Sequence, residues 1–206
     1  PALVKTLSDE MPDVRREAIL ALAAIGKGAS PAVPQLVAAL ESRTDRVPAT
    51  YALGMIGQVP DAAVAKIREN AKAEDFRVST VSHWALAKLN PTDQEEVRAA
   101  VSRLAAALKN KDTQVREAAA RALADLDPDP KTLRPILQEA LAGVDAETLS
   151  TVMDAFAGLG QRILPRLIEA LKDPQVRGRA AAIIGRIGPP AKEAVPALIA
   201  TLEDKN

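Results

Sequence analysis

The sequence of 206 residues contains no cysteine and a single histidine, His83. The lack of cysteine excludes disulfide bonds, thiolate metal sites and a cysteine nucleophile, but it leaves the compartment open because cysteine-free proteins occur in every compartment. A single histidine cannot provide a two-histidine metal site. Neither G-x-x-x-x-G-K-S/T nor G-x-G-x-x-G occurs, so the sequence does not support a phosphate-binding loop. We therefore predict that the chain is not an enzyme and has no catalytic, cofactor-binding or metal-binding residue.

The chain also lacks an excess of charge of either sign and a long apolar run. Lysine and arginine number 27, as do aspartate and glutamate, so no net field favours nucleic acid or an acidic membrane. No stretch of about 18 apolar residues occurs, and the sequence does not begin with a basic stretch followed by an apolar one. We expect a soluble segment without a membrane span or signal peptide; this favours the cytoplasm without fixing the localisation.

Aromatic residues make up only 2% of the chain, although 48% of its residues are hydrophobic. A compact globule usually fills its centre with aromatic side chains, which bury large areas. Here Ala, Leu, Val and Ile must form the core, and this favours helices packed closely in thin layers.

Internal repeats account for almost the whole sequence. The stretch 12–26, PDVRREAILALAAIG, matches further stretches that begin at residues 43, 76, 113, 146 and 174. Small or apolar residues recur in each copy at i, i+4 and i+7, which is typical of an amphipathic helix. We call this segment helix A. One column of helix A is small in every copy, as expected where neighbouring helices approach closely: Ala23, Gly54, Ala87, Ala124, Ala157 and Gly185.

A second apolar segment, helix B, follows each helix A after a turn-rich loop, as in 30–40 and 193–202. Short oxygen-bearing side chains precede helix A, where they can accept hydrogen bonds from free backbone N–H groups. They are Ser42, Asp75, Asp112, Asp145 and Asp173. Pro12 and Pro174 follow at the expected first helical position, where proline is tolerated. Residues 1–4 align with 34–37, so we expect that the chain begins inside a helix B and is a fragment of a longer protein.

These helix pairs resemble HEAT repeats, specifically the short bilin-lyase (PBS lyase) HEAT-like type. The resemblance rests on Val-Arg pairs at 14–15, 115–116 and 176–177 and on Ile-Gly pairs at 25–26, 56–57 and 187–188. It implies an all-α fold, a right-handed α-α superhelix (HEAT-repeat solenoid) of about six helix pairs plus a preceding half repeat, in one domain over residues 1–206. It also implies a ladder of acids and arginines between repeats, placed on Asp112, Asp173, Arg15, Arg46, Arg116 and Arg177. Ser79 and Leu149 interrupt the arginine column, so the third and fifth repeats should be joined less regularly.

The second repeat carries Pro48 inside the expected helix A. A proline inside a helix removes one hydrogen bond and costs about 3 kcal/mol unless it falls in the first turn. We therefore expect this helix to begin late, near Asp45, and predict a local soft spot over residues 43–72.

Two features could suggest chemistry, and each has a plainer interpretation. His83 is expected to be a partly exposed helix residue rather than a base; it is followed by Trp84, so the repeated His-Glu pairs of a related iron-binding HEAT family are absent. The run of Asp125, Asp127 and Asp129 resembles a calcium loop, but the glycine and the bidentate glutamate of that loop are not at the required spacing. A helix end followed by a helix cap is the plainer interpretation.

Two surfaces are candidates for binding a partner. In such solenoids the B helices usually line the concave face, which repeat proteins use for binding. The residues expected to point outward there are Lys5, Gln35, Lys66, Glu69, Arg103, Glu139, Arg166 and Glu169. This mixed row of charges suits a protein or peptide segment of mixed charge, although a solvated face without a partner is an equally good interpretation.

The second surface is one column of helix A in three successive repeats, Leu20, Tyr51 and Trp84, expected as a possible convex patch. Tyrosine and tryptophan are favoured in interfaces, but the same column can pack helix A against helix A.

We predict from these patterns a non-catalytic scaffold that binds a protein or peptide along its concave helix-B face, with no cofactor. A bilin-lyase-like or other enzyme-accessory or chaperone module is the alternative, and a designed scaffold is disfavoured by the uneven repeat spacing. The sequence leaves the oligomeric state and the partner open.

Overall fold

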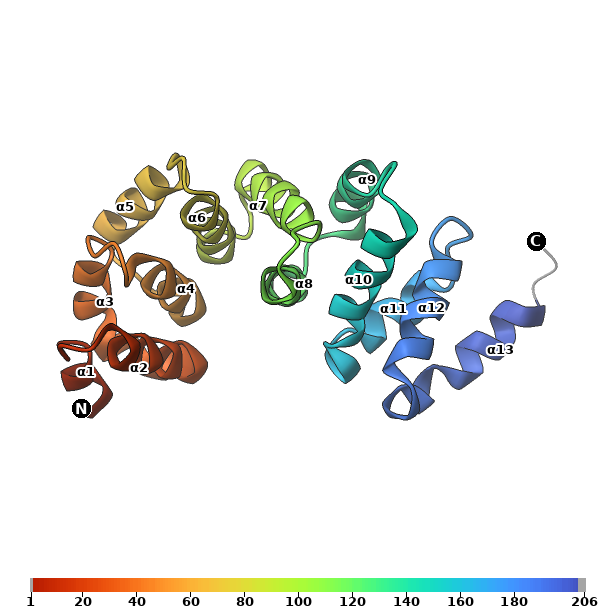
Figure 1. The fold of residues 1–206 in the computed structure, drawn as a ribbon, viewed down its shortest axis with the longest axis horizontal. Coiled ribbons are helices and arrows are strands. Elements are labelled where there is room, and N and C mark those ends of the chain that lie inside the picture. The colour runs from red at the N-terminus through yellow and green to blue at the C-terminus, as the bar shows by residue number, and fades with distance from the viewer. Residues whose placement is uncertain (1, 204–206) are drawn as a thin grey trace. The chain divides into compact units, whose positions relative to one another are not determined.

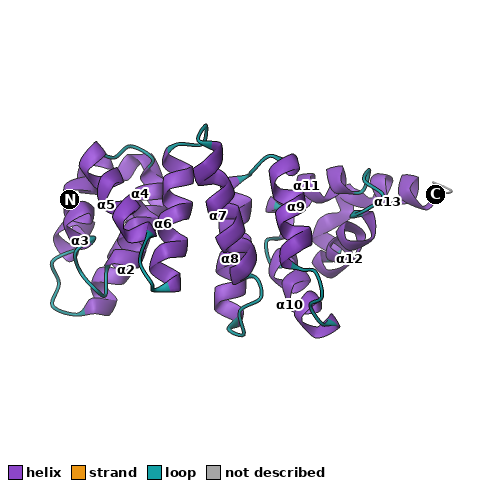
Figure 2. Cartoon of the chain, turned by 90° about the horizontal axis from the view of Figure 1, so that it is seen from above, coloured by secondary structure: helices purple, strands orange, loops and turns teal. Residues whose placement is uncertain are grey.

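The computed structural model describes residues 2–203 of the chain. Helices and the loops between them account for these residues, and no strand occurs among them (Figure 2). The chain divides into two compact units, Pro1–Arg103 and Leu104–Asn206. The fold is all-helical, as predicted, whereas a single domain over residues 1–206 stays a prediction.

The helices alternate along the chain in the order that the sequence predicts (Figure 1). From the N-terminus to the division between the units they are α1 (Ala2–Thr6), α2 (Pro12–Ile25), the 3-10 helix η1 (Gly26–Ala32), α3 (Val33–Ala39), α4 (Arg46–Ile56), α5 (Asp61–Ala71), α6 (Phe76–Leu89) and α7 (Gln94–Ala107), in which the division falls. Unit 2 continues with α8 (Thr113–Leu126), α9 (Pro130–Ala140), α10 (Ala146–Ala157), η2 (Gly160–Arg162), α11 (Leu164–Ala170), α12 (Arg177–Ile187), η3 (Pro189–Ala194) and α13 (Val195–Glu203).

Side-chain caps begin several of these helices, as predicted. Asp75 accepts hydrogen bonds from two backbone N–H groups of α6, Asp112 from one of α8 and Asp145 from one of α10. Each cap satisfies a donor that has no partner inside its helix. Pro12 occupies the first turn of α2.

Two of the predicted helix starts are wrong. Ser42 lies in the turn before α4, whose capping position is held by Asp45, and Ser42 Oγ accepts a hydrogen bond from the Asp45 backbone instead. Asp173 and Pro174 likewise form a turn ahead of α12, which begins only at Arg177. In both repeats the first residues of the pattern form a hydrogen-bonded turn, which the spacing of apolar residues does not distinguish from a first helical turn.

Helix α4 begins at Arg46, directly after Asp45, so the late start predicted from Pro48 is confirmed. Pro48 is the third residue of the helix, where its missing N–H would have no partner inside the helix in any case. Ala49, Leu53 and Ile56 of this helix are fully buried, which favours a stable helix, while the soft spot over residues 43–72 stays a prediction.

Unit 1 consists of two rows of helices (Figure 1). The A row is α2, α4 and α6, and the B row is α1, α3 and α5. Helix α4 packs extensively against both α2 and α6, and each B-row helix packs against the A-row helix that follows it. Among the described residues, α3 makes no comparable contact with α1 or α5. Because a stack bends toward its more closely packed side, unit 1 curves with the A row on the inside.

One glycine explains how the A row packs so closely. A Cβ atom on Gly54 of α4 would lie only 2.6 Å from a ring carbon of Trp84 and 3.2 Å from the Cα atom of Ala85, both in α6. The small column predicted from the repeats is therefore confirmed at this helix crossing. Of the other members, Ala23 and Ala87 are also buried.

Unit 2 repeats the same arrangement. Helix α10 packs against both α8 and α12, while α11 packs against α12. The core between α11 and α12 contains Leu164, Leu167, Leu171, Ala180 and Ile184. Helix α9 differs from these helices because none of its residues is buried.

Candidate interaction surfaces

The charged row predicted on the B helices lies on exposed or half-buried positions of unit 1. Lys5 in α1, Gln35 in α3 and Glu69 in α5 are exposed, and Lys66 in α5 and Arg103 in α7 are half-buried. The structure thus brings these residues to the surface.

Lys66, at the centre of this row, is already ion-paired with two neighbouring carboxylates. Lys66 Nζ lies 3.0 Å from Glu41 Oε1 and 3.2 Å from Glu69 Oε2. The hydrogen bond to Glu41 and then that to Glu69 raise the pKa of Lys66 above its usual value. Surface ion pairs of this kind contribute little stability, but a partner's carboxylate would have to compete with two that are already in place.

The shape of unit 1 contradicts the expectation that this row is concave. The B row is the more widely spaced row, so its outer surface lies on the convex side of the curve. The sequence could not settle this point, because the curvature depends on which row packs more closely. The repeat pattern makes both rows equally regular.

The corresponding residues of unit 2 are exposed as well. Arg166 in α11 is ion-paired with Asp127, and Glu169 accepts from Lys172 Nζ at 2.6 Å. Glu139 lies on α9, the helix without a buried residue. Here too, two of the predicted binding residues have charged neighbours from their own unit.

The predicted patch Leu20, Tyr51 and Trp84 divides into a packed part and an exposed part. The rings of Tyr51 and Trp84 stack with their centroids 5.0 Å apart and an interplanar angle of 25°. Trp84 is only 1% exposed, as the packing alternative requires, whereas Leu20 is 38% exposed. All three residues belong to helices of the A row, which is the inner row of unit 1, so the helices that carry the patch are not those of the convex B row.

His83 lies in a small charged cluster formed by α5, α6 and α7. Its Nδ1 atom is 3.7 Å from Glu96 Oε2, and Glu96 Oε1 is 3.5 Å from Nε of Arg68. Burial lowers the pKa of His83, and the positive charge of Arg103 lowers it further, while Glu96 opposes both effects. His83 is therefore a partly exposed helix residue, as predicted. Its position beside the Glu96 carboxylate could not be predicted, because no spacing in the sequence indicates it.

The acids that resemble a calcium loop are engaged with other groups. Asp129 caps α9 by accepting from the backbone of Lys131, Asp125 is ion-paired with Arg162, and Asp127 is the left-handed residue that ends α8. Within residues 2–203 no group of three histidine, cysteine, aspartate or glutamate side chains is arranged to hold a metal ion.

The comparisons with known proteins agree with the repeat pattern. The family model of the PBS lyase HEAT-like repeat matches residues 14–42, which contain most of α2 and all of α3, and residues 176–204, which contain α12 and α13. Two stretches of the chain are therefore similar to the PBS lyase HEAT-like repeat. No curated protein matches the sequence.

Solved structures also match the chain. The crystal structure of an engineered protein matches with 24% sequence identity over 97% of this chain, and the chain spans 60% of the length of that protein. The TM-score of 0.38 is too low to show that the two molecules share one arrangement of helices.

The predicted acids do not form the ladder that the HEAT resemblance implies, because Asp112 caps its own helix α8 and Asp173 is ion-paired with Arg134 of α9. Arg15 in the first repeat donates from Nε to Asp45 Oδ2 of the second repeat at 2.8 Å, but Asp45 does not belong to the predicted capping column. Arg116 instead donates to the backbone carbonyls of Asn110 and Lys111 in its own loop.

None of the helices within residues 2–203 combines the length and the apolar character that crossing a membrane requires.

Proposed function

We propose that this helical repeat module binds a protein or peptide segment on the inner surface of the A row in unit 1. The observation that carries the proposal is the exposed Leu20 on a surface whose next column member, Tyr51, is fixed by stacking on buried Trp84. An accessible apolar side chain on a rigid row of helices can anchor a partner's side chain. The concave side of a repeat stack also lets one segment contact several repeats.

The charged B row is the rival surface. Lys66 already has two carboxylate partners, and the row lies on the more widely spaced side of the unit. Both facts count against the B row, because a partner there would have to compete with the ion pairs of Lys66.

Selection from a random peptide library displayed on phage tests the two surfaces. Peptides that the wild-type chain enriches would be synthesised, and their affinity measured for Leu20→Glu and for the triple variant Lys66→Ala, Arg103→Ala, Arg166→Ala. We expect Leu20→Glu to weaken binding at least about ten-fold, roughly 1.4 kcal/mol, because it places a charge on the apolar contact. The triple variant should bind like the wild type.

If binding is lost only in the triple variant, the proposed A-row site is wrong and the peptide binds the charged row of the B helices instead. If the wild-type chain enriches no peptide above the background of an unrelated helical protein, peptide binding itself is wrong. Circular dichroism of both variants is the control for folding.

The name of the matched family suggests a second function, an accessory role in bilin attachment. A bilin chromophore that binds the chain would add a visible absorbance band which co-migrates with the protein. Titration with a free bilin and absorbance spectroscopy of the gel-filtered chain separate this function from peptide binding.

A further inference from the structure

Helix α4 reaches the solvent along a single face. Most of its residues are buried, and the half-buried ones are Arg46, Val47, Pro48, Tyr51 and Met55. Val47, Tyr51 and Met55 are spaced by four residues, so they lie one above another along the helix. Arg46, at the first position, is the only charged residue of α4. The accessible face of α4 is therefore apolar along most of its length.

Leu20 continues this face onto the neighbouring helix α2. Leu20 and Tyr51 occupy the same position of the repeat, and α2 packs against α4. The C-terminal ends of the two helices also meet, because a Cβ atom on Gly26, directly after α2, would lie 3.6 Å from the backbone oxygen of Met55. We use the name apolar strip for the following accessible residues: Leu20, Val47, Pro48, Tyr51 and Met55.

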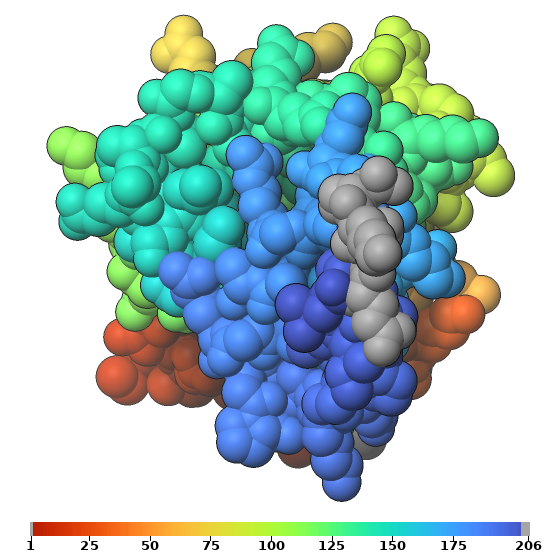
Figure 3. Space-filling view, turned by 90° about the vertical axis from the view of Figure 1, so that its right-hand side faces the viewer, coloured from red at the N-terminus to blue at the C-terminus, as the bar shows by residue number. Residues whose placement is uncertain are grey.

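The same positions of the repeat are polar in unit 2. Helix α10 also packs against two A-type helices, and its Ser150 stands at the position of Val47. Its Asp154 stands at the position of Tyr51. Arg186 of α12 donates to both, from Nε to Asp154 Oδ1 at 2.8 Å and from Nη2 to Ser150 Oγ at 2.9 Å. Atoms of α10 and α12 accordingly lie side by side in the view toward the C-terminal end of unit 2 (Figure 3). Packing between A-type helices therefore does not require apolar residues at these positions.

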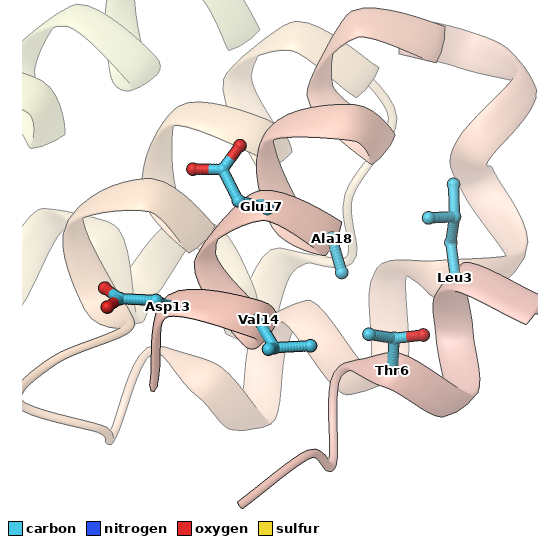
Figure 4. A pocket seen from close by; sticks show the side chains of 6 residues that line it. All are labelled: Leu3, Thr6, Asp13, Val14, Glu17 and Ala18. Carbon is cyan, nitrogen blue, oxygen red and sulfur yellow. The ribbon is translucent and has the colours of Figure 1, made fainter. Parts of the chain in front are cut away.

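The hollow where α1 meets α2 is a separate surface. It is lined by Leu3 and Thr6 of α1 and by Asp13, Val14, Glu17 and Ala18 of α2 (Figure 4). Two of these residues are carboxylates, so an apolar segment that entered the hollow would contact ionised groups. The apolar strip contains no charged residue and is the better place for an apolar partner.

The charges next to the apolar strip already have neighbours of opposite sign. Arg16 Nη2 lies 3.6 Å from Glu17 Oε1 on the exposed side of α2. A backbone hydrogen bond from Val78 lowers the pKa of Asp75, and the positive charge of Arg46 contributes to the same shift, so Arg46 has an acid within its electrostatic range. A charged residue of a partner would lose its hydration over the strip without meeting an unpaired opposite charge, which costs free energy.

We propose that the apolar strip binds an uncharged, apolar segment of a partner protein. The inference rests on the proposed function, because it states which chemistry the A-row site of unit 1 accepts. Apolar residues at positions that packing leaves free, together with balanced charges beside them, complement a segment without charge. Met55 is unbranched and adapts to side chains of different shape, so we expect a preference for apolar character rather than for one exact sequence.

Two substitutions of opposite charge test the chemistry of the partner. Peptides that the wild-type chain enriches from a random phage library would be titrated with Leu20→Glu and with Leu20→Lys. We expect both to weaken binding by a similar factor of at least about ten, because either charge would be placed against an apolar side chain. Both variants should fold normally, since Leu20 is already 38% exposed.

Met11 provides the matched control. It is a second exposed apolar residue and lies outside the apolar strip, 61% exposed. Met11→Glu and Met11→Lys change the net charge in the same way and should bind like the wild type. The affinity of the wild-type chain should also change less than about two-fold between about 0.05 M and about 0.5 M NaCl, because screening weakens only charged contacts.

The outcomes separate this inference from the proposed function. Tighter binding by one of the two Leu20 variants would show a charged partner, which overturns the inference and leaves the A-row site in place. Unchanged affinity of both variants would place the peptide elsewhere, for example in the hollow beside α1, and overturns the A-row site as well. If the wild-type chain enriches no peptide, peptide binding itself is wrong, and the inference fails with it.

Methyl NMR locates the contact. The chain has three methionines, so selective ¹³C labelling of their methyl groups gives one signal each for Met11, Met55 and Met153. We expect an enriched peptide to shift the signal of Met55 and to leave those of Met11 and of Met153 in α10 unchanged. A peptide that shifts only Met11 or Met153 overturns the assignment of the partner to the apolar strip.

Discussion

The indole ring of Trp84 fills the space that a side chain on Gly54 of the neighbouring helix would need. A methyl group on Gly54 would lie 2.6 Å from the ring. The ring in turn stacks on Tyr51, one helical turn from Gly54 in α4. The contact between α4 and α6 therefore depends on the absence of a side chain at one residue.

Gly54→Ala is expected to destabilise the protein. Alanine is the better helix former by about 1 kcal/mol, but overpacking against a fixed ring costs typically about 1–3 kcal/mol, so the net change should be a loss. Gly185→Ala is the matched control, because nothing lies within 4 Å of the added methyl group, and it should stabilise by about 0.5–1 kcal/mol. Urea unfolding of both variants gives the two free energies. Equal effects of the two substitutions would contradict the close contact.

Asp45→Ala should weaken the joint between the first two repeats. Asp45 is 6% exposed and accepts from Arg15, Ser42 and Thr44. Burial alone would raise its pKa, but the hydrogen bonds from these three side chains outweigh burial and hold the pKa below 3.8. Its removal leaves the Arg15 guanidinium without this partner, so we expect a loss of about 2 kcal/mol in the free energy of unfolding.

The control for Asp45 is Asp154→Ala, which removes an ion pair of the same length on the surface. Arg186 Nε lies 2.8 Å from Asp154 Oδ1, and the Asp154 side chain is 62% exposed. Exposed pairs contribute less than about 1 kcal/mol, so the loss should be clearly smaller than for Asp45. In addition, the contribution of Asp45 should be present above pH 3.8 and disappear as the pH falls through its lower folded pKa.

The stability of the protein should depend on the protonation of His83. Because burial and Arg103 lower its folded pKa below 6.5, the unfolded state binds more protons between the two values. The free energy of unfolding should therefore decrease as the pH falls through this window, and His83→Gln should remove that part of the dependence. Denaturation midpoints measured at neutral pH and at about pH 5 check this expectation.

Proton NMR gives the pKa of His83 directly, because it is the only histidine in the chain. Glu96→Gln should lower this pKa further, since the carboxylate is the group that raises it, and Arg103→Gln should move it upward. A pKa that neither substitution changes would show that the cluster of α5, α6 and α7 is not formed in solution.

Hydrogen exchange should distinguish α4 from α9. Most residues of α4 are buried, including Thr50 and Gly54, whereas none in α9 is buried. Local opening requires less free energy where fewer apolar contacts are lost, so amides of α9 should exchange much faster than those of α4. Slow exchange in α9 together with fast exchange in α4 would contradict this expectation and support the soft spot predicted from Pro48.

Several features of the fold follow from the sequence alone. The recurrence of 12–26 predicts the helices and their order, and the small column predicts close helix crossings. Asp75, Asp112 and Asp145 mark helix starts because a cap acts within three residues along the chain. Such local interactions depend on spacing, which a sequence displays directly.

The candidate surfaces were less predictable. The outward positions of Lys66 and Arg103 follow from helical periodicity, but the location of Lys66 on the convex side does not. The inner position of Leu20 and the burial of Trp84 depend on the close approach of α4 and α6. The ion pairs of Lys66 and the cluster around His83 join residues from different helices, and their pairing depends on how those helices are packed.

The sequence by itself determined that the chain is a series of amphipathic helix pairs, because 3.6-residue periodicity and capping are local properties of the chain. Tertiary structure alone decided which row of helices packs closely and hence which side is concave. The physical reason is that curvature depends on the contacts between neighbouring helices, which the spacing of residues within one helix does not display.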